Sequence, residues 1–234
     1  MKYQDIISCL DELANPEIAQ HSQRYFKTGK GEYGYGDKFL GIRVPVLRKH
    51  VKLFQDTNIS NVEKLLKSKY HEVRLFSLLL MVRKFSKGDI EEQEKIYNLY
   101  LLHTKYINNW DLVDSSAPYI VGPWLYDKDR SVLYKLAYSK MLWERRISIM
   151  STAYFIKNDQ FNDTLKISNI LLSDSEDLIH KAVGWMLREI GNRDIEVEEK
   201  YLKKYYKKMP RVMLRYAIEK FNKERRQAYL KGKI

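Results

Sequence analysis

Apolar residues recur along most of the chain at intervals of three and four, the period of an amphipathic α-helix. Representative stripes are Val62, Leu65, Leu66, Val73 and Phe76, and Leu133, Leu136, Ala137, Ile147 and Met150. No segment alternates apolar and polar residues between hairpin turns, as exposed strands would. The pattern therefore predicts an all-α fold.

Polar and turn-forming residues interrupt the helical pattern at eight places. The breaks lie at residues 68–71, 86–89, 105–109, 127–130, 157–160, 173–176, 191–194 and 208–210. The segments between them are predicted to be helices of about 10–16 residues, an ordinary length for globular proteins.

A basic residue recurs at one position of the predicted second helices. Arg74 precedes Arg146 by 72 residues, twice 36, and the next intervals, to Lys181 and then to Arg215, are 35 and 34 residues. The position missing from this series lies near residue 110, where Trp110 stands. Helix pairs at this period are typical of HEAT-like repeats, which stack into an α-solenoid.

We therefore predict one HEAT-like repeat domain over residues 1–234, a superhelix with N-terminal helices in 1–55 and repeat helices in 60–234. Second helices line the concave face of a solenoid, so the repeated cations would form a basic groove there. Solvation is the ordinary explanation for any single surface cation. Four cations at one register favour the groove.

The charge balance points to a polyanionic partner. Lys and Arg number 42 against 30 Asp and Glu, which gives a net charge of +12, and residues 200–234 hold 13 of the cations but only two acids. Nucleic acid or an anionic membrane surface fits such a balance. The longest apolar run, residues 75–82, is too short to span a membrane. The single cysteine, Cys9, excludes an internal disulfide and fits a reducing compartment, so we expect a soluble cytoplasmic protein.

A glycine-rich stretch at residues 28–41 contains G-x-G-x-x-G at Gly29, Gly31 and Gly34. A dinucleotide site needs a strand before this motif and a βαβ unit around it, and neither is predicted. The stretch is therefore expected to be a flexible loop. Zinc-binding, P-loop and serine-hydrolase motifs are also missing, so we expect no metal and no cofactor. Any chemistry must come from carboxylates, aromatic rings and basic groups.

The sequence N-N-W-D-L-V-D at residues 108–114 places a carboxylate beside an indole. Asn108 or Asn109 is the predicted N-cap of a helix that begins at Trp110, and Asp111 would favour the helix dipole. Trp110 and Asp114 are four residues apart and share a face. The apolar residues lie on a different face: Leu112, Val113, Ala117 and Ile120.

Trp185 follows Lys181 by four residues, so a second indole shares a face with a cation. Trp124 and Trp143 are assigned to the core. Two indoles and a carboxylate, Asp114, in a groove that binds DNA would suit an oxocarbenium-like sugar, formed when an N-glycosidic bond breaks.

Five motifs carry a resemblance to a known family. They are R-Y-F-K at 24–27, F-L-G-I-R-V-P at 39–45, N-W-D-L-V-D at 109–114, E-R-R-I-S-I at 144–149 and K-A-V-G-W-M-L-R-E at 181–189. Together they resemble the AlkD family of bacterial DNA alkylation repair glycosylases, which are built from HEAT-like repeats. The resemblance runs through nearly the whole chain.

The resemblance implies a monofunctional DNA glycosylase that excises cationic N3- or N7-alkylated purines from duplex DNA in base excision repair. It implies a catalytic role for Asp114 and contacts of Trp110 and Trp185 with the deoxyribose, the lesion remaining stacked. It also implies a nucleoid-associated bacterial protein, which we expect to be a monomer. The residues assigned to DNA binding are Arg146, Lys181, Tyr25, Arg43, Arg74, Arg188 and Arg215.

Two departures from the family concern the N-terminal DNA contacts. The loop at 28–38 is longer and richer in glycine than in well-known members, and Arg43 stands where some carry Gln. Two other functions stay open: a non-catalytic HEAT-like module that binds DNA or RNA, and a scaffold for proteins. A module that only binds gains nothing from Asp114, and binding to protein would be insensitive to salt, unlike binding to phosphates.

Overall fold

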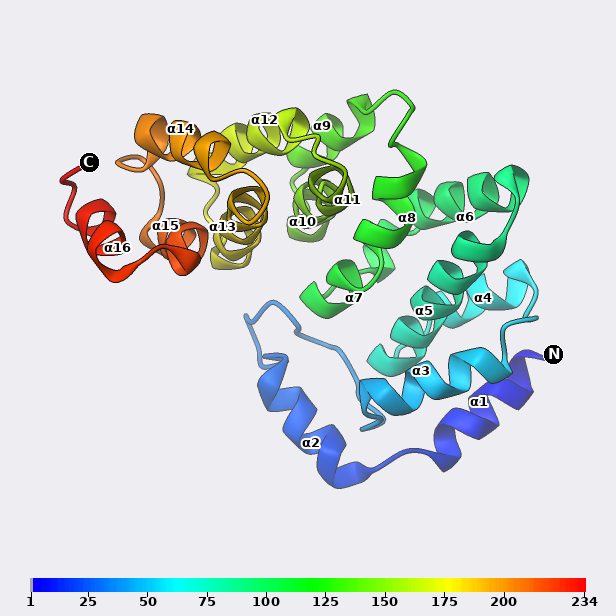
Figure 1. Cartoon of the computed structure of the whole chain (residues 1–234). Coiled ribbons are helices and arrows are strands. Elements are labelled where there is room, and N and C mark those ends of the chain that lie inside the picture. The colour runs from blue at the N-terminus through cyan, green and yellow to red at the C-terminus, as the bar shows by residue number, and fades with distance from the viewer. Residues whose placement is uncertain (1) are drawn as a thin grey trace. The chain divides into compact units, whose positions relative to one another are not determined.

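The structure is a computed structural model that describes residues 2–234 (Figure 1). Within that range the regular elements are helices, and the sole β feature is an isolated bridge between Lys38 and Tyr70. The all-α prediction is confirmed. The chain divides into two compact units, residues 1–120 and 121–234, and the prediction of a single domain over 1–234 stays a prediction.

The first unit is built around one long, almost completely buried helix, α5 (His71–Lys87). The other helices of this unit are α1 (Tyr3–Glu12), α2 (Pro16–Tyr25), α3 (Val44–Leu53), α4 (Ile59–Leu66), α6 (Ile90–Leu102), α7 (Trp110–Asp114) and the start of α8 (Ala117–Trp124). Helices α3, α4 and α6 pack against α5, which explains why its apolar residues surround the helix instead of forming one stripe.

The second unit has α13 (Asp177–Gly191) at its centre. Around it are α9 (Ser131–Ala137), α10 (Leu142–Ser151), α11 (Ala153–Lys157), α12 (Asn162–Ile170), α14 (Ile195–Tyr205), α15 (Arg211–Ala217) and α16 (Lys223–Leu230). Within this unit α9, α12 and α14 lie along one side, while α10, α13 and α15 form the other layer (Figure 1). This pairing of first and second helices is the arrangement expected of helical repeats.

A glycine allows close helix packing in the second unit. A Cβ atom at Gly184 of α13 would lie 2.4 Å from the carbonyl oxygen of Met213 in α15. Only glycine permits such an approach of one backbone to another.

Each of the eight predicted breaks falls at a boundary between helices. Asparagine or aspartate caps several helices, since their side chains accept backbone N–H bonds at the first turn. Asp89, Asn109 and Asp194 cap helices that follow predicted breaks, and Asn15, Asn58 and Asn222 cap three others. The joint between α10 and α11 was not predicted, because Thr152 keeps helical dihedral angles there and no glycine or proline marks it.

The end of the glycine-rich stretch is anchored to α5. The carboxylate of Glu72, which is 4% exposed, accepts hydrogen bonds from the backbone N–H groups of Leu40, Gly41 and Ile42, at 2.9, 2.8 and 3.3 Å. The N–H of His71 also donates to the carbonyl of Lys38, at 2.8 Å. The loop expected from the sequence is therefore held at its C-terminal end by the first turn of α5.

Candidate functional site

The helix α7 begins where the sequence predicts. Asn109 is fully buried, and its Oδ1 accepts the N–H of Trp110 at 2.8 Å. Trp110 and Asp114 are both half-buried. Leu112 and Val113 of α7 are fully buried, and so are Ala117 and Ile120, which belong to the next helix, α8. The residues predicted to be buried are therefore buried, but the one helix predicted for this segment is divided in two at residues 115–116.

The ring of Trp110 belongs to an aromatic cluster formed with the end of α2. Phe26 stacks on Trp110, with ring centroids 5.4 Å apart and planes inclined by 27°. Tyr25 meets Trp110 edge-on at 6.0 Å and is 58% exposed. The indole therefore has a fixed partner on one side and lies beside an exposed phenol, a surface suited to contacts with sugars and bases.

The aromatic cluster continues inward to His71, the first residue of α5. Phe26 stacks on Phe39, with centroids 5.1 Å apart, and also contacts the His71 ring at 4.9 Å. Phe39 stacks on the same imidazole at 4.7 Å. Three segments distant in sequence, at residues 26, 39 and 71, thus support the ring of Trp110.

His71 is also the centre of a buried charge network. Its Nε2 lies 2.7 Å from Oδ2 of Asp111, and its Nδ1 lies 3.3 Å from Oδ2 of Asp37. The other oxygen of Asp37 accepts hydrogen bonds from Nη2 of Arg74 at 2.8 Å and from the amide of Asn108 at 3.2 Å. Two carboxylates thus face one imidazole and one guanidinium.

The surroundings of His71 favour its charged form. Burial alone would lower its pKa, but the negative charge and hydrogen bond of Asp111, together with the hydrogen bond to Asp37, raise the pKa to about 9. Burial likewise opposes ionisation of Asp37, but the hydrogen bond from His71 and the charge of Arg74 hold the Asp37 pKa below its usual range. Asp111 therefore does more than favour the helix dipole, since it binds His71.

Asp114 lies close to a buried tyrosine. Burial raises the pKa of Tyr100 well above its ordinary value, and the negative charge of Asp114 raises it further, while a hydrogen bond to Ser116 opposes both. The Tyr100 hydroxyl lies 3.0 Å from Oγ of Ser116. The Tyr100 phenol therefore stays protonated and neutral beside Asp114 near neutral pH.

Trp185 occupies a comparable half-buried position in the second unit. Its Nε1–H donates to Oε1 of Glu189 at 2.9 Å, and Nη2 of Arg188 donates to the same oxygen at 3.3 Å. Arg188 also pairs with Glu219. The sequence interpretation missed Glu189, although its position four residues after Trp185 is a signal that could have shown it.

The repeated cations occupy one position of the second helices in the second unit. Arg146, Lys181 and Arg215 are the fifth residues of α10, α13 and α15. In α7 the fifth residue is Asp114, not Trp110. This corrects the repeat register: an acid replaces the recurring cation, and the tryptophan lies one helical turn earlier.

The residues assigned to DNA binding differ in exposure. Arg43, the N-cap of α3, and Arg215 are exposed, and Lys181 pairs with Asp177 at 2.6 Å near the surface. Arg146 is 4% exposed, and its Nη1 donates to the carbonyl of Leu178 at 2.5 Å.

Arg74 does not fit the predicted role. It is 3% exposed, paired with Asp37, and its Nη1 donates to the carbonyl of Ser68 at 3.0 Å. A guanidinium that is enclosed and bonded in this way neutralises a buried carboxylate and is not available to DNA phosphates. This corrects the expectation that Arg74 lines a basic groove.

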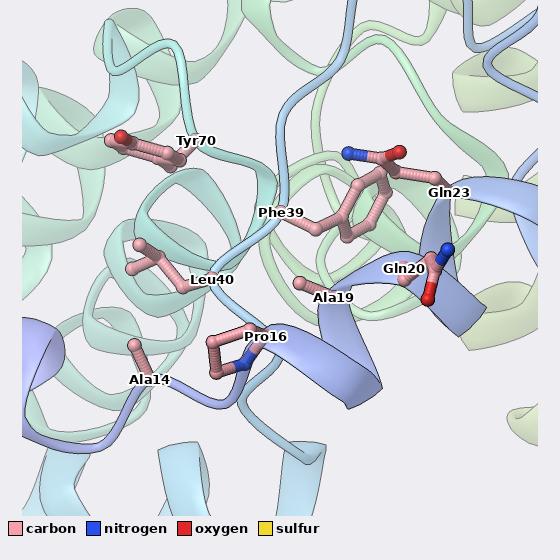
Figure 2. Close-up of a pocket in the computed structure, with 8 residues that line it drawn as sticks. All are labelled: Ala14, Pro16, Ala19, Gln20, Gln23, Phe39, Leu40 and Tyr70. Carbon is pink, nitrogen blue, oxygen red and sulfur yellow. The ribbon is translucent and has the colours of Figure 1, made fainter.

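A small pocket shares Phe39 with the aromatic cluster (Figure 2). Its volume is about 340 Å³. Its walls come from α2, from the segment that Glu72 anchors and from the residues just before α2 and α5. They comprise Ala14, Pro16, Ala19, Gln20, Gln23, Phe39, Leu40 and Tyr70. Across residues 2–234 there is no group of three or more His, Cys, Asp or Glu side chains arranged to hold a metal ion. No helix in that range is long and apolar enough to cross a membrane.

Known proteins resemble this chain in sequence pattern and in fold. A sequence model of the family described as DNA alkylation repair enzyme matches residues 6–221. A solved structure described as a predicted DNA alkylation repair enzyme from Enterococcus faecalis is 17% identical, with 90% of this chain and 97% of that chain covered and a TM-score of 0.68. The smu.31 protein from Streptococcus mutans UA159 is 16% identical, with coverage of 92% and 95% and a TM-score of 0.48. No curated protein matches. At 17% identity the likeness to the Enterococcus protein concerns the fold.

Proposed function

Since this chain belongs to the DNA alkylation repair enzyme family, we propose that it is a glycosylase that excises cationic N3- or N7-alkylated purines from duplex DNA. The observation that carries the proposal is the pair Trp110 and Asp114. Both are half-buried on the same side of α7, and Trp110 is held by the stack with Phe26. A carboxylate beside a fixed indole is suited to a cationic transition state.

The reaction needs little help with the leaving group. An alkylated purine carries a positive charge, so the C1′–N bond breaks with its electron pair moving to the purine, which departs neutral. The sugar becomes an oxocarbenium-like cation, which the carboxylate of Asp114 stabilises by its charge. Water then adds to C1′, and its proton passes to Asp114 or to solvent. The products are the free base and an abasic site.

Trp185 keeps the role that the family resemblance implies, a contact with the deoxyribose. Its indole is oriented by Glu189, so its face would remain available to a sugar. For the DNA backbone we propose the exposed cations Arg43 and Arg215, with the half-buried Lys181, as phosphate contacts. Arg146 is not among them, because it is as enclosed as Arg74 and donates to the carbonyl of Leu178. Tyr25, exposed beside Trp110, would lie against the strand that carries the lesion.

The test is base release from a duplex with a single N7-methylguanine. Wild type should release the free base and leave an abasic site without cutting the strand. Asp114→Asn should slow single-turnover release at least about tenfold, which corresponds to about 1.4 kcal/mol of barrier. Asp11→Asn, which changes an exposed carboxylate on α1, is the matched control and should leave the rate unchanged.

The alternative, a module that binds nucleic acid without chemistry, gives a different result. Wild type would then release no base, while binding to duplex would persist and weaken steeply with salt. Asp114→Asn would tighten that binding or leave it alone, because a carboxylate repels phosphates. Salt-insensitive binding to a protein, with no DNA binding, would indicate a scaffold.

A further inference from the structure

Helix α7 is too short to hold its own position. It has five residues, whereas isolated helices need about 12–15 residues to be even marginally stable in water. The direction in which Trp110 points must therefore be fixed by contacts with the rest of the protein. His71 supplies such contacts in two ways.

The first contact acts on the backbone around Trp110. His71 binds Asp111, the residue after Trp110, and through Asp37 it is linked to Asn108, two residues before it. Oδ1 of Asp111 also accepts the N–H of Leu112 at 2.9 Å. The chain is thus held on both sides of Trp110 by one network.

The second contact acts on the indole ring. The His71 imidazole contacts Phe26 at 4.9 Å, and Phe26 stacks on Trp110 at 5.4 Å. Phe39 contacts both the imidazole, at 4.7 Å, and Phe26, at 5.1 Å, so the three rings form a triangle. One side chain therefore bears on the backbone of α7 by hydrogen bonds and on the ring of Trp110 through Phe26.

The hydrogen-bond geometry specifies the protonation state of His71. Both ring nitrogens face carboxylate oxygens, and an ionised carboxylate can only accept hydrogen bonds. A neutral imidazole has one N–H, so it would leave one of the two carboxylates facing a lone pair. The imidazolium has two N–H groups and satisfies both. Because His71 is 2% exposed, losing one of these bonds would leave a buried group without its partner.

We propose that His71, as an imidazolium joining Asp111 to Asp37, is the positioning residue that fixes Trp110 for catalysis. The catalytic part of this proposal rests on the proposed function, whereas the structural part does not. The charged groups that bear on the ring are Asp111 from α7, Asp37 from the loop and Arg74 from α5. Phe26 and Phe39 contribute no charge. Removal of the proton or of the imidazole should release Trp110 from its fixed orientation.

The test follows Trp110 directly. The protein is labelled with 5-fluorotryptophan, which gives one ¹⁹F resonance for each of the four tryptophans, and Trp110→Phe identifies the relevant one. His71→Gln should shift or broaden the Trp110 resonance. The other three tryptophans, Trp124, Trp143 and Trp185, belong to the second unit, and their resonances should stay in place.

The matched control is His103→Gln. His103 is likewise buried, at 7% exposed, and its Nε2 binds the carboxylate of Glu63 at 2.9 Å. Its aromatic neighbour is Tyr106, outside the cluster that holds Trp110. This variant loses a similar buried contact but should leave the Trp110 resonance unchanged.

A wild-type titration needs no variant that might misfold. The Trp110 resonance should move between pH 7 and 10 with a midpoint near 9, the pKa raised by Asp111 and Asp37 against the effect of burial, and the movement should vanish in His71→Gln. In single-turnover assays on the N7-methylguanine duplex, His71→Gln should lose about tenfold or more in rate while DNA affinity changes less than about threefold.

The outcomes separate the two proposals. If wild type releases no base, the proposed function fails, but the ¹⁹F spectra still decide whether His71 fixes Trp110. A Trp110 resonance unmoved both by His71→Gln and by pH overturns the positioning role. An active enzyme whose excision rate is unchanged in a folded His71→Gln protein overturns the catalytic part. If His71→Gln does not fold, Asp111→Asn and the wild-type titration replace it.

Discussion

Glu198 provides a prediction about stability that is independent of the proposed chemistry. It lies on α14, is 1% exposed, and its Oε1 has no hydrogen-bond partner among residues 2–234. Burial raises its pKa from 4.5 to about 8, the charge of Glu199 adds to this, and the charge of Arg188 opposes it. A carboxyl in this position is neutral in the folded protein at moderate pH, whereas in the unfolded chain it ionises.

The sign follows from the two pKa values. Between pH 4.5 and about 8 the folded state binds more protons than the unfolded state, so the free energy of unfolding decreases as pH rises. Below pH 4.5 the carboxyl is protonated in both states, so Glu198 adds no pH dependence to the free energy of unfolding. At pH 7 the interval of about 2.5 units from the unfolded pKa of 4.5 to the pH corresponds to an upper figure of about 3 kcal/mol, taking 1.36 kcal/mol per unit. Glu198→Gln removes the ionisable group, so it should recover a large part of this free energy of unfolding.

The assay is urea unfolding followed by circular dichroism at pH 5.5, 6.5 and 7.5. The difference in stability between Glu198→Gln and wild type should grow with pH, by up to about 1.4 kcal/mol for each pH unit. Glu196→Gln, which changes an exposed carboxylate in the first turn of the same helix, should show the same pH dependence of stability as wild type. A Glu198→Gln advantage that is constant or shrinks as pH rises would refute the reasoning.

Three further predictions concern other contacts. Glu72→Gln should lower the free energy of unfolding by about 2–3 kcal/mol, since one carboxylate accepts three backbone N–H bonds; urea unfolding measures it. Gly184→Ala should cost about 1–3 kcal/mol, because the new methyl group would lie 2.4 Å from a carbonyl oxygen, and thermal unfolding would show a lower Tm. Arg215→Gln should reduce the slope of log Kd for duplex DNA against log salt by about one, whereas Lys67→Gln, whose lysine pairs with Glu63, should leave that slope alone.

The parts of the fold that depend on nearby residues were predictable. The helix breaks carry local signals, among them the asparagine cap that the residue types predict at Asn108 or Asn109 and that the structure places at Asn109. The burial of Trp124 and Trp143, both 8% exposed, follows from the helical period. Boundaries without such signals were missed, as at Thr152, where the backbone stays helical. Propensity and periodicity describe a window of a few turns and little beyond it.

The support of the candidate site was not predictable from the sequence. His71 reaches Asp111 across 40 residues, Arg74 reaches Asp37 across 37, and Asn108 reaches Asp37 across 71. Pairings of this length leave no periodic trace in one sequence. The same limit explains the error at Arg74: its helical register is regular, but its partner comes from a loop whose path the sequence does not specify.

The anchoring of the glycine-rich stretch has a consequence for how this protein can be altered. Gly29 and Glu32 close a local turn through two hydrogen bonds, and at its tip Gly31 has a φ of +84° and open space around it. The residues that hold Phe39 and Asp37, namely Phe26, His71, Arg74 and Asn108, lie outside this turn. Insertions between Lys30 and Gly31 should therefore be tolerated, which makes this turn the natural place for a fluorophore or a purification tag. The same arrangement would let relatives vary the length of this loop without moving the aromatic support of Trp110.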